Sequence, residues 1–535
     1  MRFLGNISVA AAALAISTQT AASEYKLNII HINDLHSRIE SISRFNGSCD
    51  SESEAEGKCF GGVARVATKI DELRNSLSAA GENYIVLDAG DQFQGSLMYT
   101  TYKGAAEAEF MEKIGFDAMA VGNHEFDDGP QALAEFVDMV SFPVVSGNLD
   151  LDRSELLRGR IENHVVLEVG GEKIGIVSAL ATDTSETSSP GPNVGFDDEI
   201  ASLTEDVAAL EEAGVNKIIA LTHVGLPVDI EIASAVQGID AVVGGHSHTY
   251  LSSSDPDADG EYPTWVESAG GNRIPVVQAF AYSKYVGHLI LEFDAEGALL
   301  RAEGDTLVLD ASVEPNADIV ARVAELAGPI EELKSLVVAS AASKVEGDRS
   351  VCRVEECAMG NLVADAMLAS VMEQGGEIAI QNGGGLRASF SEGEITMGDV
   401  LAVLPFQNTL ATFDATGQTI VDALENGVSQ VEGVKGRFPQ VSGLKYTWDP
   451  SVAPNEGRIQ EVLVLSNGEW APINANAVYR VVSNNYVRQG GDGYDMFATA
   501  ENAYDYGPNL EEVVADYLAA NSPYEPYTDG RIASR

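Results

Sequence analysis

Short apolar runs alternate with longer amphipathic segments from about Tyr25 to Leu309. The runs have the length of buried strands, and the segments between them repeat apolar residues at helical spacing. Regular alternation of strands and helices predicts a layered α/β domain. The clearest helices are expected at Gly62 to Ser76, Gly129 to Met139 and Glu199 to Ala213.

A different pattern follows this region. The stretch from Asn316 to Leu336 is expected to be a mostly helical connector that breaks at Gly328-Pro329, because proline removes a helical hydrogen bond. A second domain is expected to begin near Ala339. Its predicted helices cover residues 358–371, 397–403, 419–431 and 510–520, and its predicted strands cover residues 377–381, 444–448 and 478–482. A chain of 535 residues is long enough for more than one domain. The domain boundaries we expect are 24–312, 313–338 for the connector, and 339–535.

Polar side chains that can bind metal ions follow five of the apolar runs. Five of the eight histidines in the chain lie just after such a run, mixed with carboxylates and an asparagine. The carboxyl ends of strands meet at one edge of an α/β sheet, and imidazole with oxygen ligands suits divalent cations. The candidate ligands are Asp34, His36, Asp91, Asn123, His223, His246 and His248. The other histidines, His31, His164 and His288, are expected to be structural.

Two of these segments indicate phosphoester chemistry. Asp91 lies between the other ligand groups in sequence and is the natural carboxylate to bridge two cations. His124 directly follows Asn123, and Asp127 lies three residues further on. A carboxylate beside an imidazole favours its protonated form, which a leaving alkoxide needs. The pattern therefore predicts in-line attack by metal-activated water on a phosphorus centre.

The net charge of the chain argues against some classes of binding partner. The chain has 32 basic and 82 acidic residues and a formal net charge of −50. Such a charge argues against nonspecific nucleic-acid binding and against docking to anionic membranes. It is typical of an adaptation for solubility. Any phosphate site must therefore provide strong local positive charge.

The N-terminus has the pattern of a secretory signal, which we place at residues 1–23. Arg2 gives a positive charge, an alanine-rich apolar stretch runs from Ile7 to Ile16, and small residues near Ala22 and Ser23 suit cleavage. An uncleaved anchor is less favoured because a membrane span needs about 20 apolar residues. The C-terminus has no hydrophobic anchor tail. The sequence predicts a periplasmic or secreted protein.

The four cysteines form two close pairs in sequence, Cys49 with Cys59 and Cys352 with Cys357. An even number of cysteines in an exported chain favours two local disulfides. Zinc ligation is the alternative, but neither pair has the CxxC spacing and no histidine lies nearby.

At this point the sequence resembles the 5′-nucleotidase family of calcineurin-like metallophosphatases. The segments that carry the resemblance are Asn33-Asp34-Leu35-His36, Gly90 to Gly95, Gly122 to Asp127, Thr222-His223 and Gly244 to Thr249. The resemblance covers nearly the whole mature chain. It implies an α/β (α+β) fold: a four-layer metallophosphatase β-sandwich flanked by helices, a connector helix and a second α/β substrate-binding domain.

The resemblance also implies two metal ions. One would be bound by Asp34, His36, Asp91 and His248, and the other by Asp91, Asn123, His223 and His246. His124 with Asp127 would form the dyad that stabilises the transition state. Zinc is the expected metal, with manganese, cobalt and magnesium as alternatives.

In the second domain, the resemblance implies a nucleotide site. Arg353 would bind phosphate, and the loop with Asn382, Gly384, Gly385 and Arg387 would contact phosphate and nucleoside. Phe406 and Tyr486 would hold the base between two rings, and Asp492 would contact the ribose. Taken alone, Phe406 and Tyr486 have the pattern of core residues, and Asn382 to Gly385 that of a turn. Tyr486 departs from the family, which often has phenylalanine there. The Gly-Lys-Ser/Thr ending of a P-loop is absent.

The sequence thus predicts an exported hydrolase that removes the 5′-phosphate of nucleoside monophosphates, with a nucleotide as substrate and no membrane anchor. A UDP-sugar or dinucleotide pyrophosphohydrolase and a 2′,3′-cyclic-nucleotide phosphodiesterase with 3′-nucleotidase activity are alternatives within the same chemistry. A noncatalytic exported nucleotide-binding protein is the alternative from a different class. Because the base clamp and the metal ligands lie on separate domains, we also expect a domain rotation.

Overall fold

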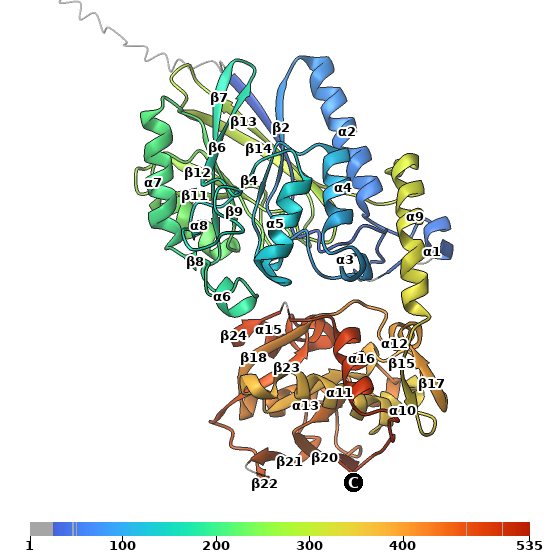
Figure 1. Cartoon of the computed structure of the whole chain (residues 1–535). Coiled ribbons are helices and arrows are strands. Elements are labelled where there is room, and N and C mark those ends of the chain that lie inside the picture. The colour runs from blue at the N-terminus through green and yellow to red at the C-terminus, as the bar shows by residue number, and fades with distance from the viewer. Residues whose placement is uncertain (1–24, 45, 47, 50, 467, 506) are drawn as a thin grey trace, which may run out of the picture.

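The computed structural model describes residues 25–535 except 45, 47, 50, 467 and 506, so the predicted signal peptide lies outside the described residues. The chain forms two domains, which a long helix, α9 (Ala317–Lys334), joins along one side (Figure 1).

The N-terminal domain contains two six-stranded sheets that pack face to face. The first has the order β14 (Leu299–Val308), β13 (Tyr285–Phe293), β1 (Tyr25–Ile32), β2 (Asn83–Asp88), β3 (Ala118–Ala120) and β4 (Val144–Val145). The second has the order β11 (Thr264–Glu267), β12 (Arg273–Val277), β10 (Ala241–Val243), β9 (Ile218–His223), β7 (Glu172–Leu180) and β6 (His164–Val169). The central strands of both sheets are parallel, so their carboxyl ends meet at the same edge.

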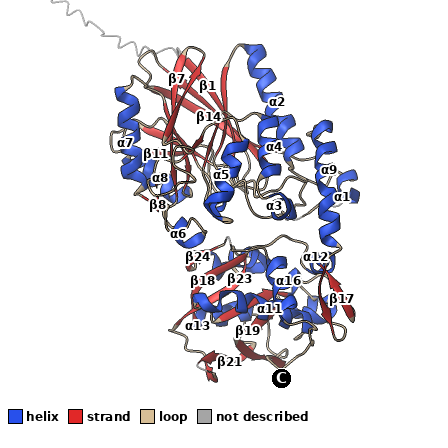
Figure 2. Ribbon diagram, in the orientation of Figure 1, coloured by secondary structure: helices blue, strands red, loops and turns tan. Residues whose placement is uncertain are grey.

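Alternating side chains of each strand pack into different layers. In β1, Leu27 and Ile29 belong to the core between the sheets, whereas Ile30 and Ile32 pack toward the helices outside. Figure 2 shows the strands at the centre of the domain with helices on both sides. The helices that cover the first sheet are α2 (Val63–Ala80), α4 (Ala105–Ile114) and α5 (Gly129–Met139), and those that cover the second are α7 (Glu199–Glu212) and α8 (Leu226–Ala235). The predicted four-layer arrangement is confirmed.

Shorter elements surround these layers. They are α1 (Ser51–Ala55), α3 (Leu97–Tyr102), the 3₁₀ turn η1 (His124–Phe126), α6 (Thr184–Thr187), β5 (Leu149–Asp150) and β8 (Gly195–Phe196).

The predicted break in the connector is wrong. Helix α9 continues through Gly328 and Pro329 to Lys334. Its apolar side chains Ile319, Leu326 and Ile330 are buried on both sides of the proline. Their packing fixes the helical backbone, which offsets the hydrogen bond that proline removes.

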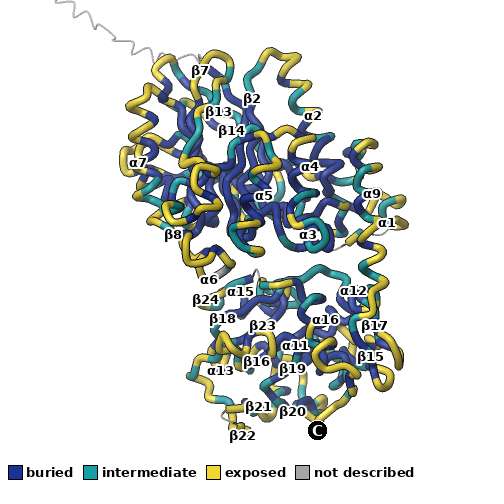
Figure 3. The backbone as a smooth tube through the Cα atoms, viewed as in Figure 1, coloured by how far each residue is buried: buried dark blue, intermediate teal, exposed yellow. Residues whose placement is uncertain are grey.

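The C-terminal domain has a five-stranded mixed sheet in the order β19 (Pro439–Ser442), β16 (Ile378–Asn382), β23 (Val478–Asn484), β18 (Leu410–Thr416) and β24 (Glu501–Tyr504). Beside it lie a four-stranded sheet, β22 (Glu469–Pro472), β21 (Ile459–Ser466), β20 (Leu444–Trp448) and β25 (Ile532–Ser534), and a pair, β15 (Val337–Ala341) and β17 (Gly393–Thr396). Figure 3 shows buried residues, in dark blue, at the centre of both domains. One cluster of buried apolar side chains, which includes Ile30, Leu326 and Leu518, extends from one domain through α9 into the other.

Helices of this domain largely follow the predicted positions. They are α10 (Arg349–Cys352), α11 (Ala358–Val371), α12 (Met397–Val403), α13 (Gly417–Gly427), α14 (Asn485–Arg488), α15 (Asp495–Ala498) and α16 (Leu510–Ala520), with 3₁₀ turns η2 (Met372–Gln374), η3 (Gly383–Gly385), η4 (Val431–Gly433) and η5 (Gly491–Gly493). Helix α13 begins two residues earlier than predicted, because the side chain of Thr416 caps it. It ends at Gly427 rather than at Val431. Pro439 packs against Gly427 and leaves no space there for a larger side chain.

Both predicted disulfides are present, Cys49–Cys59 and Cys352–Cys357. Among the described residues, no helix has the length and apolar character needed to cross a membrane.

Candidate functional site: a buried metal centre and a neighbouring cavity

The predicted metal ligands lie together at or just past the carboxyl ends of β1, β2, β3, β9 and β10. The loops that follow these strands turn sharply, and several of their residues have a left-handed backbone, which is uncommon and mildly strained for residues other than glycine. These residues are Asp34 (φ 51°), His36 (φ 48°), Asp91 (φ 58°), His246 (φ 74°) and His248 (φ 51°). Such strain persists only where surrounding contacts hold it, and it is frequent at functional sites.

Asp34, His36 and His248 form one buried group. Their ligand atoms lie within 4.8 Å of one another. His248 Nε2 is 3.2 Å from Asp34 Oδ1 and 2.9 Å from His36 Nε2. Two imidazole nitrogens this close, facing one carboxylate, can form the donor set of a divalent cation.

A second group contains Asp91, His223 and His246, whose ligand atoms also lie within 4.8 Å of one another. His223 donates from Nδ1 to the carbonyl oxygen of Ala89 at 2.6 Å, which directs Nε2 toward Asp91 Oδ2, 3.0 Å away. A carbonyl that fixes the second ring nitrogen is a common partner of metal-bound histidine. Asn123 Oδ1 lies 2.8 Å from His246 Nδ1 and so joins this group.

The electrostatics of the site fit a bound cation. Burial alone would lower the pKa of His223, but the charges of Asp91 and Asp34 raise it to about 10. The pKa of Asp91 is well below its usual value, because His223 and His124 outweigh its burial. Among the described residues, Asp91 Oδ2 and His223 Nε2 are buried without a well-aligned hydrogen bond. A metal ion satisfies such atoms, and we conclude that this is a divalent-metal site.

His124 lies beside the predicted metal ligands, but its hydrogen-bond partner, Asp127, is not one of them. Its Nδ1 is 2.6 Å from Asp127 Oδ2, and its ligand atom also lies within 4.8 Å of those of His36 and Asp91. Burial would lower the pKa of His124, but Asp127 and Asp91 raise it to about 9. Asp127 is itself oriented by Ser188 Oγ, which donates to it at 2.7 Å. This pair can supply a proton at neutral pH.

Glu125 organises the backbone around Asp91, a role that its sequence pattern does not predict. Its buried carboxylate accepts N–H groups of Gly122 (2.7 Å), Asp91 (3.0 Å), Gln92 (2.8 Å) and Phe93 (3.2 Å). Glu125 therefore ties the loop after β2 to the loop after β3. Only its position next to His124 could have drawn attention to it.

The predicted nucleotide-site residues surround a separate cavity of about 250 Å³ in the C-terminal domain. Its lining includes Arg353, Asn382, Gly384, Gly385, Arg387, Phe406, Asn408, Tyr486 and Asp492. The guanidinium of Arg387 lies over the Phe406 ring, 5.2 Å from its centre. Tyr486 is 43% exposed, so its ring is available to a ligand.

Two residues near this cavity were missed in the sequence. Arg349 lies one helical turn before Arg353, and its charge contributes, after burial, to lowering the pKa of Arg353 and of Arg387. Its spacing of four residues from Arg353 was the available signal. Asn408 lines the cavity two residues after Phe406 and has no distinctive sequence pattern.

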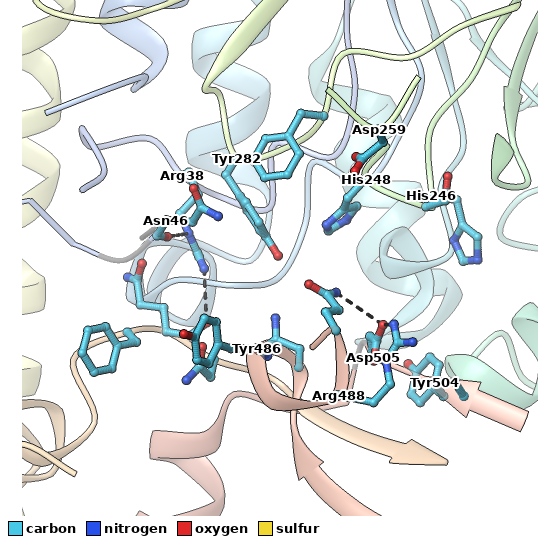
Figure 4. Close-up of a pocket in the computed structure, with 18 of the residues that line it drawn as sticks. Arg38, Asn46, His246, His248, Asp259, Tyr282, Tyr486, Arg488, Tyr504 and Asp505 are labelled. Carbon is cyan, nitrogen blue, oxygen red and sulfur yellow. Dashed lines mark hydrogen bonds and ion pairs between the residues drawn. The ribbon is translucent and has the colours of Figure 1, made fainter. Parts of the chain in front are cut away.

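A cleft of about 610 Å³ between the domains connects the two halves of the site. In Figure 4, Arg38, Tyr282, His246 and His248 of the N-terminal domain face Tyr486, Arg488 and Tyr504 of the C-terminal domain. Phe406, Asn408 and Tyr486 line both this cleft and the smaller cavity.

The three remaining histidines lie in other environments. His31 Nε2 contacts the hydroxyl of Tyr262 at 2.9 Å, His164 pairs with Asp206, and His288 contacts Asn28. None of the three belongs to the metal-ligand groups found among the described residues.

Comparisons with known proteins agree with this architecture. Residues 27–250 match the calcineurin-like phosphoesterase family, and residues 337–499 match the 5′-nucleotidase C-terminal domain. A 5′-nucleotidase of Diplobatis ommata is 38% identical over 532 residues, which cover 96% of this chain and 90% of that protein.

Solved structures give the same result. A 5′-nucleotidase precursor from Thermus thermophilus is 40% identical with a TM-score of 0.61, over 95% of this chain and 99% of that one. The NAD nucleotidase of Haemophilus influenzae is 28% identical with a TM-score of 0.75, over the same shares of the two chains.

The four-layer sandwich and its ligand cluster thus define a metal-dependent phosphoesterase, an enzyme that hydrolyses phosphoric ester bonds. The family and sequence matches cover both domains and nearly the whole chain, and they identify the family within this class of enzyme. This chain belongs to the 5′-nucleotidase family.

Proposed function

We propose that this chain is an exported enzyme that removes the 5′-phosphate of nucleoside monophosphates to give nucleoside and phosphate. One observation supports this proposal most strongly. Phe406 and Tyr486 line both the arginine-containing cavity and the cleft that contains His246 and His248. A nucleotide whose base lies between these rings could therefore extend its phosphate toward the metal site.

The roles we propose for the metal site follow from its donors. Asp34, His36, Asp91 and His248 would bind one divalent cation, and Asp91, Asn123, His223 and His246 the other. Two such cations supply Lewis-acid activation of water and neutralise phosphoryl charge. Zinc is the metal we expect, because imidazole and carboxylate ligands together suit it.

The protein side chains would perform the remaining steps. His124, kept protonated by Asp127, would donate its proton to the leaving 5′-oxygen. Arg353 and Arg387 would bind phosphate oxygens and provide the local positive charge that a chain of net charge −50 otherwise lacks. Stacking on Phe406 and Tyr486 would contribute roughly 1–3 kcal/mol for the base.

A domain rotation would complete the site. Within the described chain, Arg353 and Arg387 line the small cavity, whereas His246 and His248 line the interdomain cleft. A rotation of one domain relative to the other would let a single phosphate contact both sets. Small-angle scattering with and without a non-hydrolysable nucleotide analogue tests this proposal. Identical curves, together with full activity of an enzyme cross-linked in its unliganded form, would rule the rotation out.

Export is proposed from two features. Residues 1–23 have the composition of a secretory signal, and the two disulfides favour an oxidising compartment. Expression of the full chain followed by N-terminal sequencing of the mature protein tests both export and the expected cleavage near Ala22 or Ser23.

Hydrolysis of a dinucleotide is the second candidate, favoured by the likeness to the NAD nucleotidase. Phosphate release from AMP, UMP, UDP-glucose, ATP, NAD and 2′,3′-cyclic AMP, measured with zinc, manganese, cobalt and magnesium, ranks the candidates. We expect AMP or UMP to be hydrolysed with the highest kcat/KM. If no substrate in this panel were hydrolysed with any metal, the enzyme would not be a nucleotidase.

A further inference from the structure

Tyr486 does more in this structure than offer a ring to the cavity. Its hydroxyl accepts the backbone N–H of Asp492 at 3.1 Å and donates to Asp492 Oδ1 at 3.3 Å. A phenylalanine would provide the same stacking face without either hydrogen bond. The hydroxyl is therefore the part of Tyr486 that needs an explanation.

Asp492 needs such restraint because of its backbone. It has a left-handed conformation (φ 56°) and follows Gly490 (φ 98°) and Gly491, with Gly493 (φ 79°) after it. Glycines on both sides make this segment permissive, and a left-handed aspartate is unfavourable unless contacts hold it. The Tyr486 hydroxyl binds both the backbone and the side chain of Asp492 and so fixes the direction of the carboxylate.

The second oxygen of this carboxylate is fixed by a different residue. Asn382, which is 97% buried, donates from Nδ2 to Asp492 Oδ2 at 2.7 Å. Asn382 is itself held by Asn484, whose Nδ2 donates to Asn382 Oδ1 at 3.0 Å. The carboxylate thus has one protein donor on each oxygen.

This arrangement leaves matching acceptor capacity on both oxygens. An ionised carboxylate can accept about four hydrogen bonds, two per oxygen. With Tyr486 on Oδ1 and Asn382 on Oδ2, each oxygen retains room for one further donor. The two hydroxyl groups of a vicinal cis-diol can provide these two donors, one to each carboxylate oxygen. Gly384 and Gly436 lie beside the same carboxylate, where a Cβ would come within 3.2 Å and 3.0 Å of Oδ2, so their lack of side chains keeps this side of the cavity open.

We propose that the Tyr486 hydroxyl is a specificity-determining group that positions Asp492 to bind both hydroxyls of a ribose, so that the enzyme selects ribonucleotides over 2′-deoxy and 2′,3′-dideoxy nucleotides. This inference rests on the proposed function, because it assigns the cavity to the nucleoside part of the substrate. It gives a role to the hydroxyl group of Tyr486, which is not needed for stacking against the base.

Nucleoside binding tests this without depending on catalysis. Isothermal titration of the full mature chain with adenosine, 2′-deoxyadenosine and 2′,3′-dideoxyadenosine compares wild type with Tyr486→Phe, which keeps the ring. We expect Tyr486→Phe to weaken adenosine binding roughly five- to tenfold, as the loss of one or two hydrogen bonds implies, and dideoxyadenosine binding less than about twofold. Asp492→Asn should remove most of the preference for adenosine over 2′,3′-dideoxyadenosine. It therefore shows the largest loss of preference that Tyr486→Phe can cause.

A second variant separates positioning from stacking. Phe406→Leu removes the other aromatic ring and should weaken the binding of all three nucleosides by a similar factor. The same four proteins are then assayed on AMP and 2′,3′-dideoxy-AMP, where Tyr486→Phe should raise KM for AMP and leave kcat nearly unchanged. Equal weakening of all three nucleosides by Tyr486→Phe, or no weakening of adenosine, would overturn the inference. If wild type binds adenosine with discrimination but releases no phosphate from AMP, the proposed function fails while this inference stands.

Discussion

Arg38 donates from Nη2 to the backbone carbonyl oxygen of Gln407, 3.2 Å away. This hydrogen bond joins the loop after β1 to the loop that contains Phe406. The same guanidinium contacts the carbonyl oxygens of His36 and Asn46, each at 3.3 Å, and is almost fully buried. One side chain thus fixes the backbone of both halves of the site.

Replacing Arg38 should affect stability and substrate binding together. Arg38→Ala leaves buried carbonyl oxygens without this donor, which costs roughly 1–3 kcal/mol for each unsatisfied group. We expect a lower free energy of unfolding in urea and a raised KM for the nucleotide, because the Phe406 loop loses its anchor. Arg301→Ala, which removes an exposed arginine paired with Glu303, is the matched control. Arg38→Ala with the stability and KM of that control would show that the link is not functional.

The proposed dyad, His124 with Asp127, and the proposed bridging carboxylate, Asp91, should respond differently to substitution. His124→Ala removes the proposed proton donor, so kcat should fall roughly 10²–10⁴-fold while the metal content stays close to that of wild type. Asp91→Asn replaces a charged oxygen with a neutral amide, so it should lower the number of metal ions bound per chain. Metal analysis by mass spectrometry, alongside phosphate release, measures both effects. Loss of metal in His124→Ala but not in Asp91→Asn would reverse these roles.

Much of the metal site could be predicted because its residues follow apolar runs that mark the strand ends. Asp91, His223 and His246 illustrate this, since each comes from a different strand and all three meet at one edge. The contacts of Arg38 and Glu125 could not be predicted in the same way. They depend on how irregular loops fold against each other, and no periodic pattern encodes that packing. The continuous helix α9 shows the same limit, because tertiary packing on both sides of Pro329 outweighs its local preference.

Glu125→Gln should weaken the metal site without unfolding the domain. An amide keeps one acceptor oxygen but places an NH₂ group against backbone N–H donors, so at least one of the hydrogen bonds to Asp91, Gln92, Phe93 and Gly122 is lost. We expect weaker metal binding by roughly 10- to 100-fold, the usual effect of losing a group that orients a ligand. Competition with a chelator measures this, and circular dichroism checks the fold.

The control for this variant is Glu135→Gln, which changes an exposed carboxylate on helix α5. It should leave chelator competition unchanged. Equal behaviour of the two variants would mean that Glu125 has no special role in the metal site.

Glu107 should make the protein less stable as the pH rises. It is buried in helix α4, where Oε1 accepts from Ser37 Oγ at 2.5 Å, and burial raises its pKa from 4.5 to about 7. The folded state therefore binds this proton more tightly than the unfolded state, so stability is fully present below about pH 4.5 and is lost as the pH rises through about 7. Glu107→Gln removes the buried charge and keeps an acceptor for Ser37. We expect the variant to exceed wild type in unfolding free energy at pH 8, on the order of 3 kcal/mol, with little difference at pH 5.

Glu109, two residues further along α4, provides a control of opposite sign. Arg322 lowers the pKa of this carboxyl to about 2, so its charge stabilises the folded state above pH 4.5, and that contribution is lost as the pH falls toward 2. Glu109→Gln should therefore destabilise the protein at pH 8, whereas Glu107→Gln stabilises it. Urea unfolding of wild type and both variants at pH 5 and pH 8 measures the two effects side by side. A Glu107→Gln variant that lost stability at pH 8 would show that the folded state prefers the ionised carboxylate.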